Sequence, residues 1–227
     1  MRFLGPRWAT AVALTVALAG PPLFVVVPRR IFGEFPGVAT QFLLQLVFCS
    51  LAVFVWLVVI RVERLPVASI GLRRPTASTV TSGLALGAAS LYLLPLVTAP
   101  LVRALGHGGV DEEIRRLAAL PLWFRMFVAI TSGIVEETLY RGYAVERLAV
   151  LTGHVGLGAF IAALAFGVAH IPAWGIGFAL GADLPFGVVM IAFYLWRRDL
   201  VANAIAHSTG LVVDLLSIAP DFTCMIR

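Results

Sequence analysis

The chain has 227 residues, of which 60% are apolar and only 13% carry a charge. So little polar surface excludes an ordinary soluble domain and indicates a single membrane domain. The net charge is +5, and every Lys or Arg position is an arginine. These arginines are scattered in pairs between apolar runs, a pattern that does not favour nucleic-acid binding.

Seven apolar stretches follow one another along the chain, and most reach the roughly 20 residues that a membrane-spanning helix needs. They cover residues 8–27, 40–60, 79–102, 121–140, 157–171, 175–196 and 200–218. A sheet with an open edge cannot face lipid, and no alternating strands of barrel length are visible. The sequence therefore predicts an all-α, polytopic transmembrane bundle of about seven helices.

The first stretch has some features of a cleavable leader, because Ala17-Leu18-Ala19 resembles a signal-peptidase site. Apolar character resumes after Pro21 and Pro22 and continues to Val27. We therefore predict an uncleaved first helix. The fifth stretch is short and is followed by Pro172, which predicts a helix that is tilted, buried or incomplete in its span.

Arginine placement predicts the orientation in the cell membrane, because cytoplasmic loops carry an excess of arginine. A cytoplasmic N-terminus puts ten arginines inside and six outside. The inside group is Arg2, Arg7, Arg61, Arg64, Arg73, Arg74, Arg141, Arg147, Arg197 and Arg198. The outside group is Arg29, Arg30, Arg103, Arg115, Arg116 and Arg227.

We expect residues 1–120 to hold three transmembrane helices and an interfacial segment, and residues 121–227 to hold the catalytic core. The charge-balanced run Asp111–Arg116 precedes Leu117, Leu120 and Trp123, which is typical of a segment that lies along the membrane surface.

Ionisable side chains are rare within the stretches, and each costs about 2.5–3.5 kcal/mol to insert, so they are candidates for function. Glu136 and Glu137 lie on the fourth stretch, His170 ends the fifth, and His207 lies with Asn203 on the seventh. Asp183 and Asp214 complete the set.

The two glutamates differ in their predicted partners. Glu137 and Arg141 are four residues apart on one helix face and can neutralise each other. Glu136 points about 140° away from Arg141, so it lacks that partner. A buried, unpaired carboxylate is suited to act as a general base, although it can also be buried neutral and idle.

The two histidines each share a helix face with a residue four positions earlier. Phe166 precedes His170, and Asn203 precedes His207. Each pair alone is a weak signal. One unpaired glutamate and two histidines on three helices of one bundle form a stronger one.

These three motifs, in this order, resemble the CPBP family of CAAX proteases and bacteriocin-processing (Abi) proteins. The resemblance is carried by Glu136-Glu137 with Arg141, by Phe166 with His170, and by His207, and it extends over residues 121–216. It implies an intramembrane endopeptidase, a hydrolase, that cleaves membrane-anchored proteins or peptides in a CAAX-type or peptide-maturation role.

The resemblance also implies roles for single residues. Glu136 and His170 would activate a water, while His207 and a nearby asparagine would stabilise the oxyanion. Glu137, Arg141 and Phe166 would support them. This chain departs from the family at Leu211, where a polar residue is usual, so we predict that Asn203 takes over as the oxyanion donor.

Three alternatives remain open at this stage. Glu136, His170 and His207 could bind zinc, although the HExxH motif is absent and this use of Glu136 removes the evident base, so we favour a mechanism without a metal cofactor. Leu211 keeps open a non-catalytic membrane partner or immunity protein with relic motifs. Buried glutamate and histidine also occur in proton-coupled carriers.

Overall fold

The computed structural model describes residues 6–33, 36–106, 116–117 and 119–217. Every regular element in these ranges is helical, which confirms the predicted all-α class. The predicted interfacial segment at residues 111–116 lies almost entirely outside the described residues.

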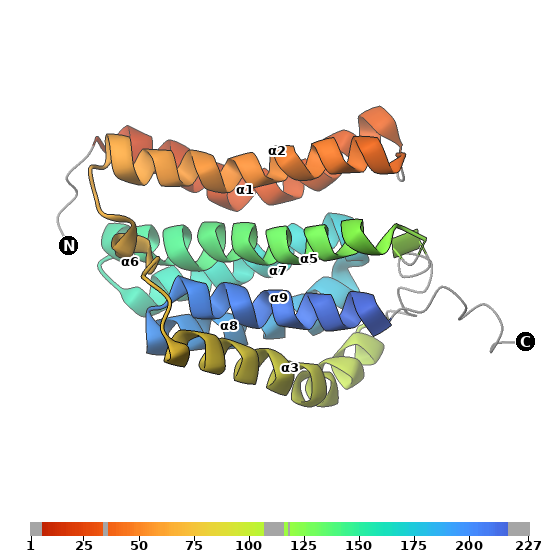
Figure 1. Ribbon diagram of the computed structural model, residues 1–227. Coiled ribbons are helices and arrows are strands. Elements are labelled where there is room, and N and C mark those ends of the chain that lie inside the picture. The colour runs from red at the N-terminus through yellow and green to blue at the C-terminus, as the bar shows by residue number, and fades with distance from the viewer. Residues whose placement is uncertain (1–5, 34–35, 107–115, 118, 218–227) are drawn as a thin grey trace, which may run out of the picture.

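The N-terminal part forms three long helices. They are α1 (Arg7–Phe32), α2 (Val38–Leu57), which continues into the π-helix η1 (Val58–Val62), and α3 (Ala77–Ala104), with the short 3-10 helix η2 (Val67–Ile70) before α3. Helices α1 and α2 lie side by side on one side of the bundle, and α3 lies on the other (Figure 1).

The C-terminal part lies between these two sides (Figure 1). A continuous helix runs through α5 (Leu122–Glu136), the π-helix η3 (Glu137–Val145) and α6 (Glu146–Thr152). It is followed by α7 (Val155–Phe178), the π-helix η4 (Ala179–Asp183), α8 (Leu184–Arg197) and α9 (Leu200–Ser217). Helix α9 packs against both α3 and α5.

Four helical stretches of the described residues are long and apolar enough to cross a membrane. They are Arg7–Phe32, Val38–Val62, Ala77–Ala104 and Val155–Arg197, with Leu200–Leu216 as a shorter apolar helix. The longest of them contains both the fifth and the sixth predicted stretch. These helices support the prediction of a multi-pass membrane protein.

The structure corrects the predicted ends of two helices. The fourth helix continues to Thr152, and Arg141, which the arginine placement assigns to the cytoplasmic side, is fully buried in the bundle. The charge does not end the helix because Glu137 neutralises it within the bundle. The fifth helix passes through Pro172 and breaks at Gly175, whose φ of 79° favours glycine.

Glycines bring α3 and α9 into close contact. A Cβ atom on Gly83 would lie 2.7 Å from the carbonyl oxygen of Ala202, and one on Gly87 would lie 2.8 Å from that of Ala206. Small residues at helical spacing commonly allow membrane helices to pack in this way. Through α9, this packing sets the position of His207.

A buried ion-pair network joins α1, the residue that follows η1, η3 and α6. Glu63 accepts hydrogen bonds from Thr10 and Tyr143, both at 2.9 Å, and its carboxylate pairs with Arg147 at 2.7 Å. Burial raises the pKa of Glu63, but the hydrogen bonds and the positive charge of Arg147 outweigh it and hold this pKa below its ordinary value. Glu63 lies just beyond the second span.

We expect this network to make the fold sensitive to acid. Because the pKa of Glu63 is lowered on folding, its contribution to the free energy of unfolding is complete above the ordinary carboxyl pKa, about 4.3, and is lost as the pH falls through the lowered value. Melting temperatures in detergent between neutral and acidic pH measure this loss. Glu63→Gln should melt lower at neutral pH and show a smaller further decrease in acid. An unchanged acid dependence in this variant would contradict the assignment.

Candidate active site

Glu136 and Glu137 lie at the junction between α5 and η3, midway along one continuous helix. Segments of π-helix recur at functional sites because they interrupt the regular α-helical bonding. The side chain of Glu137 is fully buried, whereas that of Glu136 is 14% exposed. Only Glu136 is therefore open to a small molecule such as water.

His170 is held by its own helix. Its Nδ1 lies 2.7 Å from the carbonyl oxygen of Phe166, and since a carbonyl can only accept a hydrogen bond, Nδ1 must carry the hydrogen. In the neutral ring, Nε2 is then free to accept a proton. This Nε2 lies 3.8 Å from Oε2 of Glu136.

His207 is held by Glu137. Its Nδ1 lies 2.8 Å from Oε1 of Glu137, so the carboxylate accepts a hydrogen bond from the ring and fixes its orientation. Its Nε2 lies 3.9 Å from Oε2 of Glu136. Glu137 is therefore more than the partner of Arg141 that the helix spacing predicted.

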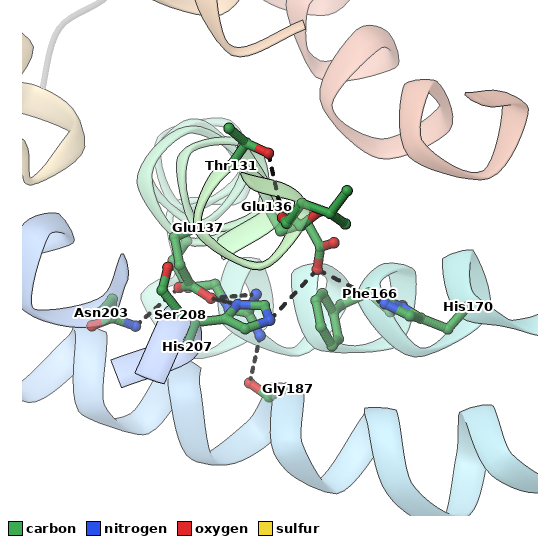
Figure 2. A network of polar contacts seen from close by, with 12 residues as sticks. Thr131, Glu136, Glu137, Phe166, His170, Gly187, Asn203, His207 and Ser208 are labelled. Carbon is green, nitrogen blue, oxygen red and sulfur yellow. Dashed lines mark hydrogen bonds and ion pairs between the residues drawn. The ribbon is translucent and has the colours of Figure 1, made fainter. Parts of the chain in front are cut away.

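The two imidazoles converge on one oxygen atom. Figure 2 shows the Glu136 carboxylate between His207 and His170. Oε2 of Glu136 is buried and accepts no hydrogen bond from the described residues. Each imidazole Nε2 lies nearly 4 Å from this oxygen, which is beyond the length of a direct hydrogen bond.

Arg141 and Phe166 form the base of the site. Arg141 pairs with Oε1 of Glu137 at 3.0 Å, and its guanidinium lies 4.1 Å from the centre of the Phe166 ring. The same ring packs against His170 at 4.5 Å. The ion pair restricts the rotamers of Glu137, and the ring contact restricts those of His170.

Asn203 faces Glu137. Its side-chain amide donates to Oε2 of Glu137 at 3.1 Å and to the carbonyl oxygen of Met190 at 2.8 Å. In this conformation its amide is thus committed to the support of Glu137, and its predicted role as an oxyanion donor stays a prediction. Leu211 offers no polar group in its place.

Two glycines allow the helices that carry the site to approach. A Cβ on Gly133 would lie 2.4 Å from Oγ of Ser208, the residue next to His207. A Cβ on Gly187 would lie 2.8 Å from the ring of Phe166. The close contacts of α5 with α9 and of α7 with α8 bring the separate motifs together.

Glu136, His170 and His207 are the residues that could hold a zinc ion, and whether a metal takes part stays a prediction. Zinc lies about 2.0–2.1 Å from nitrogen ligands. No group of three or more histidine, cysteine, aspartate or glutamate side chains among the described residues is arranged to hold a metal ion. Glu136, His170 and His207 would have to move towards a common point to do so.

The structure adds two residues to which the sequence assigned no role. Asp183, in η4, is close enough to interact electrostatically with His170, Glu136 and His207, and its buried Oδ2 has no hydrogen-bond partner among the described residues. The hydroxyl of Tyr140 is likewise buried, with no hydrogen-bond partner in the part of the chain that the structure describes. An aspartate inside an apolar stretch was the only signal in the sequence for the first of them.

The fold and the site together define a helical membrane protein with a buried glutamate flanked by two histidines. Residues 118–211 match the family model described as type II CAAX prenyl endopeptidase, Rce1-like. This part of the chain is therefore similar to that family, which confirms the resemblance that the motifs indicated. No match was found among the curated proteins or among the solved structures.

Proposed function

We propose that this protein is an intramembrane endopeptidase in which Glu136 and His170 activate a water molecule. The single observation that carries this proposal is the convergence of both imidazole Nε2 atoms on the unpartnered Oε2 of Glu136. The matched family is one of endopeptidases, which supports peptide hydrolysis as the reaction. The buried position of the site within the helical bundle supports cleavage inside the membrane.

In the proposed reaction, a water bridges Glu136 and His170. Glu136 accepts one of its protons, the oxygen attacks the carbonyl carbon of the substrate peptide, and a tetrahedral oxyanion forms. Collapse of this intermediate breaks the C–N bond, and Glu136 returns the proton to the departing amine. The exposed fractions of Glu136 (14%) and His170 (19%) leave these two groups reachable from outside the bundle.

His207 is suited to stabilise the oxyanion. Because its Nδ1–H is donated to Glu137, it can donate from Nε2 only as the imidazolium. A fixed donor aimed at the developing negative charge lowers the barrier more than a mobile one does. Asn203 contributes indirectly in this conformation, through Glu137.

The proposed substrates are membrane-anchored proteins or peptides, including those with a prenylated C-terminal CAAX sequence. The N-terminus would face the cytoplasm, in accord with the arginine count. A buried site between apolar helices favours substrates that already partition into the bilayer.

We expect proteolysis to survive metal removal. The purified protein in detergent would be incubated with a pooled library of lipidated and unlipidated C-terminal peptides, with and without a chelator. Products would be detected by mass spectrometry, and bound metal would be quantified in the same samples. The expected result is cleavage of lipidated peptides at an unchanged rate in chelator.

Two other outcomes would change the proposal. Loss of cleavage in chelator, together with stoichiometric zinc in the untreated protein, would make Glu136, His170 and His207 metal ligands. Absence of any product with every peptide would favour a non-catalytic membrane partner.

A further inference from the structure

A second site lies at the end of the bundle, away from the catalytic cluster. A pocket of about 600 Å³ is lined by residues of η2 and the turn after it, α6, the start of α7 and the end of α8. Candidate spans end at Val62 and Arg197 and begin at Ala77 and Val155, so these elements meet where helices leave the bilayer. Glu146, in its wall, follows Glu136 by ten residues, about 15 Å along the helix.

The wall of the pocket is held by a polar cluster. Tyr194 donates to Oε1 of Glu146 at 2.9 Å, and Arg198 forms an ion pair with the same carboxylate. The Arg198 guanidinium also lies 5.7 Å from the centre of the Tyr194 ring. Tyr194 packs so closely on Gly71 that a Cβ there would lie 2.7 Å from its ring.

The backbone of Arg198 indicates that its side chain is needed here. Its φ of 49° and ψ of 40° are left-handed, a conformation that costs little for glycine but is strained for arginine. Glycine at this helix end would relieve the strain but would remove the guanidinium from the pocket. Strained positions of this kind are a reason to look for a ligand.

The pocket carries an excess positive charge. Arg198 neutralises Glu146, while Arg73 is exposed and has no ion pair or hydrogen bond among the described residues. Ser69 accepts a hydrogen bond from Arg147 at 3.3 Å and keeps its own hydroxyl hydrogen available to donate. Arginine and hydroxyl donors together match the oxygens of a phosphate group.

We propose that this pocket binds the phosphate of an anionic phospholipid headgroup, with Arg73 as the principal contact and Arg198 and Ser69 as further donors. The position at the bilayer surface favours a lipid as the source of that phosphate. Ala149, Val150 and Val155 add an apolar wall that a glycerol backbone can contact and a soluble phosphate does not need. This inference does not depend on the proposed proteolysis.

The test is lipid binding to the full chain in a neutral detergent, measured by native mass spectrometry. Phosphatidylglycerol would be compared with phosphatidylcholine of the same acyl chains. We expect the wild type to bind phosphatidylglycerol about fivefold more tightly, the effect of one arginine near an anionic surface. Arg73→Gln should abolish this preference.

Arg74→Gln is the matched control, because Arg74 is the exposed neighbour of Arg73 and does not line the pocket. It should keep the preference. Ala149→Phe, which fills the pocket without a change of charge, should abolish it, and melting temperatures would show that each variant is folded. Equal effects of Arg73→Gln and Arg74→Gln, or no effect of Ala149→Phe, would overturn the site. Competition by soluble glycerol phosphate at the same concentration as the lipid would overturn the lipid as its source.

Discussion

Glu136→Gln is expected to reduce peptide cleavage by about 10²- to 10⁴-fold, the usual contribution of a general base. The amide has nearly the shape of the carboxylate but cannot take a proton from water. Oε2 of Glu136 accepts no hydrogen bond from the described residues, so the substitution should leave the packing intact. Initial rates with one lipidated peptide, at equal concentrations of folded protein, measure the effect.

The melting temperature is the control for this variant, and it should change little. A folded Glu136→Gln protein that cleaves within tenfold of the wild-type rate would show that another group is the base. Asp183 would then be the next candidate, because it also interacts with both histidines and its Oδ2 is unpartnered. Asp183→Asn in the same assay would distinguish the two carboxylates.

Glu137→Gln is expected to lower the free energy of unfolding by about 3–5 kcal/mol, the usual cost of one buried charge left without its partner. Glu137 and Arg141 are both fully buried, and Glu137 also holds His207 and Asn203. Loss of the carboxylate leaves the Arg141 charge uncompensated. Thermal or denaturant unfolding in detergent would measure the loss.

A second substitution separates the charge effect from the loss of hydrogen bonds. In the double variant Glu137→Gln, Arg141→Met no buried charge is left unpaired, and we expect it to recover most of the lost stability. Cleavage should stay low, because His207 still lacks the carboxylate that fixes the orientation of its ring. If the double variant were as unstable as the single one, the ion pair would not be the main contribution of Glu137.

The division of roles between the two glutamates could be predicted from the helix period alone. Residues four apart share a face, so the pairing of Glu137 with Arg141 followed from their spacing, as did the lack of that partner at Glu136. The position of Arg141 could not be predicted in this way. An arginine at the end of an apolar run indicates a membrane boundary. Only the tertiary structure shows that Arg141 lies inside the bundle, beside the fully buried Glu137.

The position of His170 shows the same limit. Along the chain it ends the fifth apolar stretch, just before Pro172, and its place there does not indicate a contact with Glu136. The helix in fact continues to Gly175, and packing in the bundle brings Nε2 of His170 to 3.8 Å from Glu136. The distance between two helices depends on how their side chains pack against each other. The period of a single helix carries no information about that packing.

The amino-acid sequence by itself determined the membrane class, the helical stretches and the few ionisable residues within them, because the cost of burying charge and the helix period are local properties. Only the tertiary structure decided which nitrogen of each imidazole faces Glu136 and that Glu137 supports His207. It also decided that Arg73 and Arg198 line one pocket. These features join residues far apart in the chain, and close contacts at glycines such as Gly133 determine how near they come.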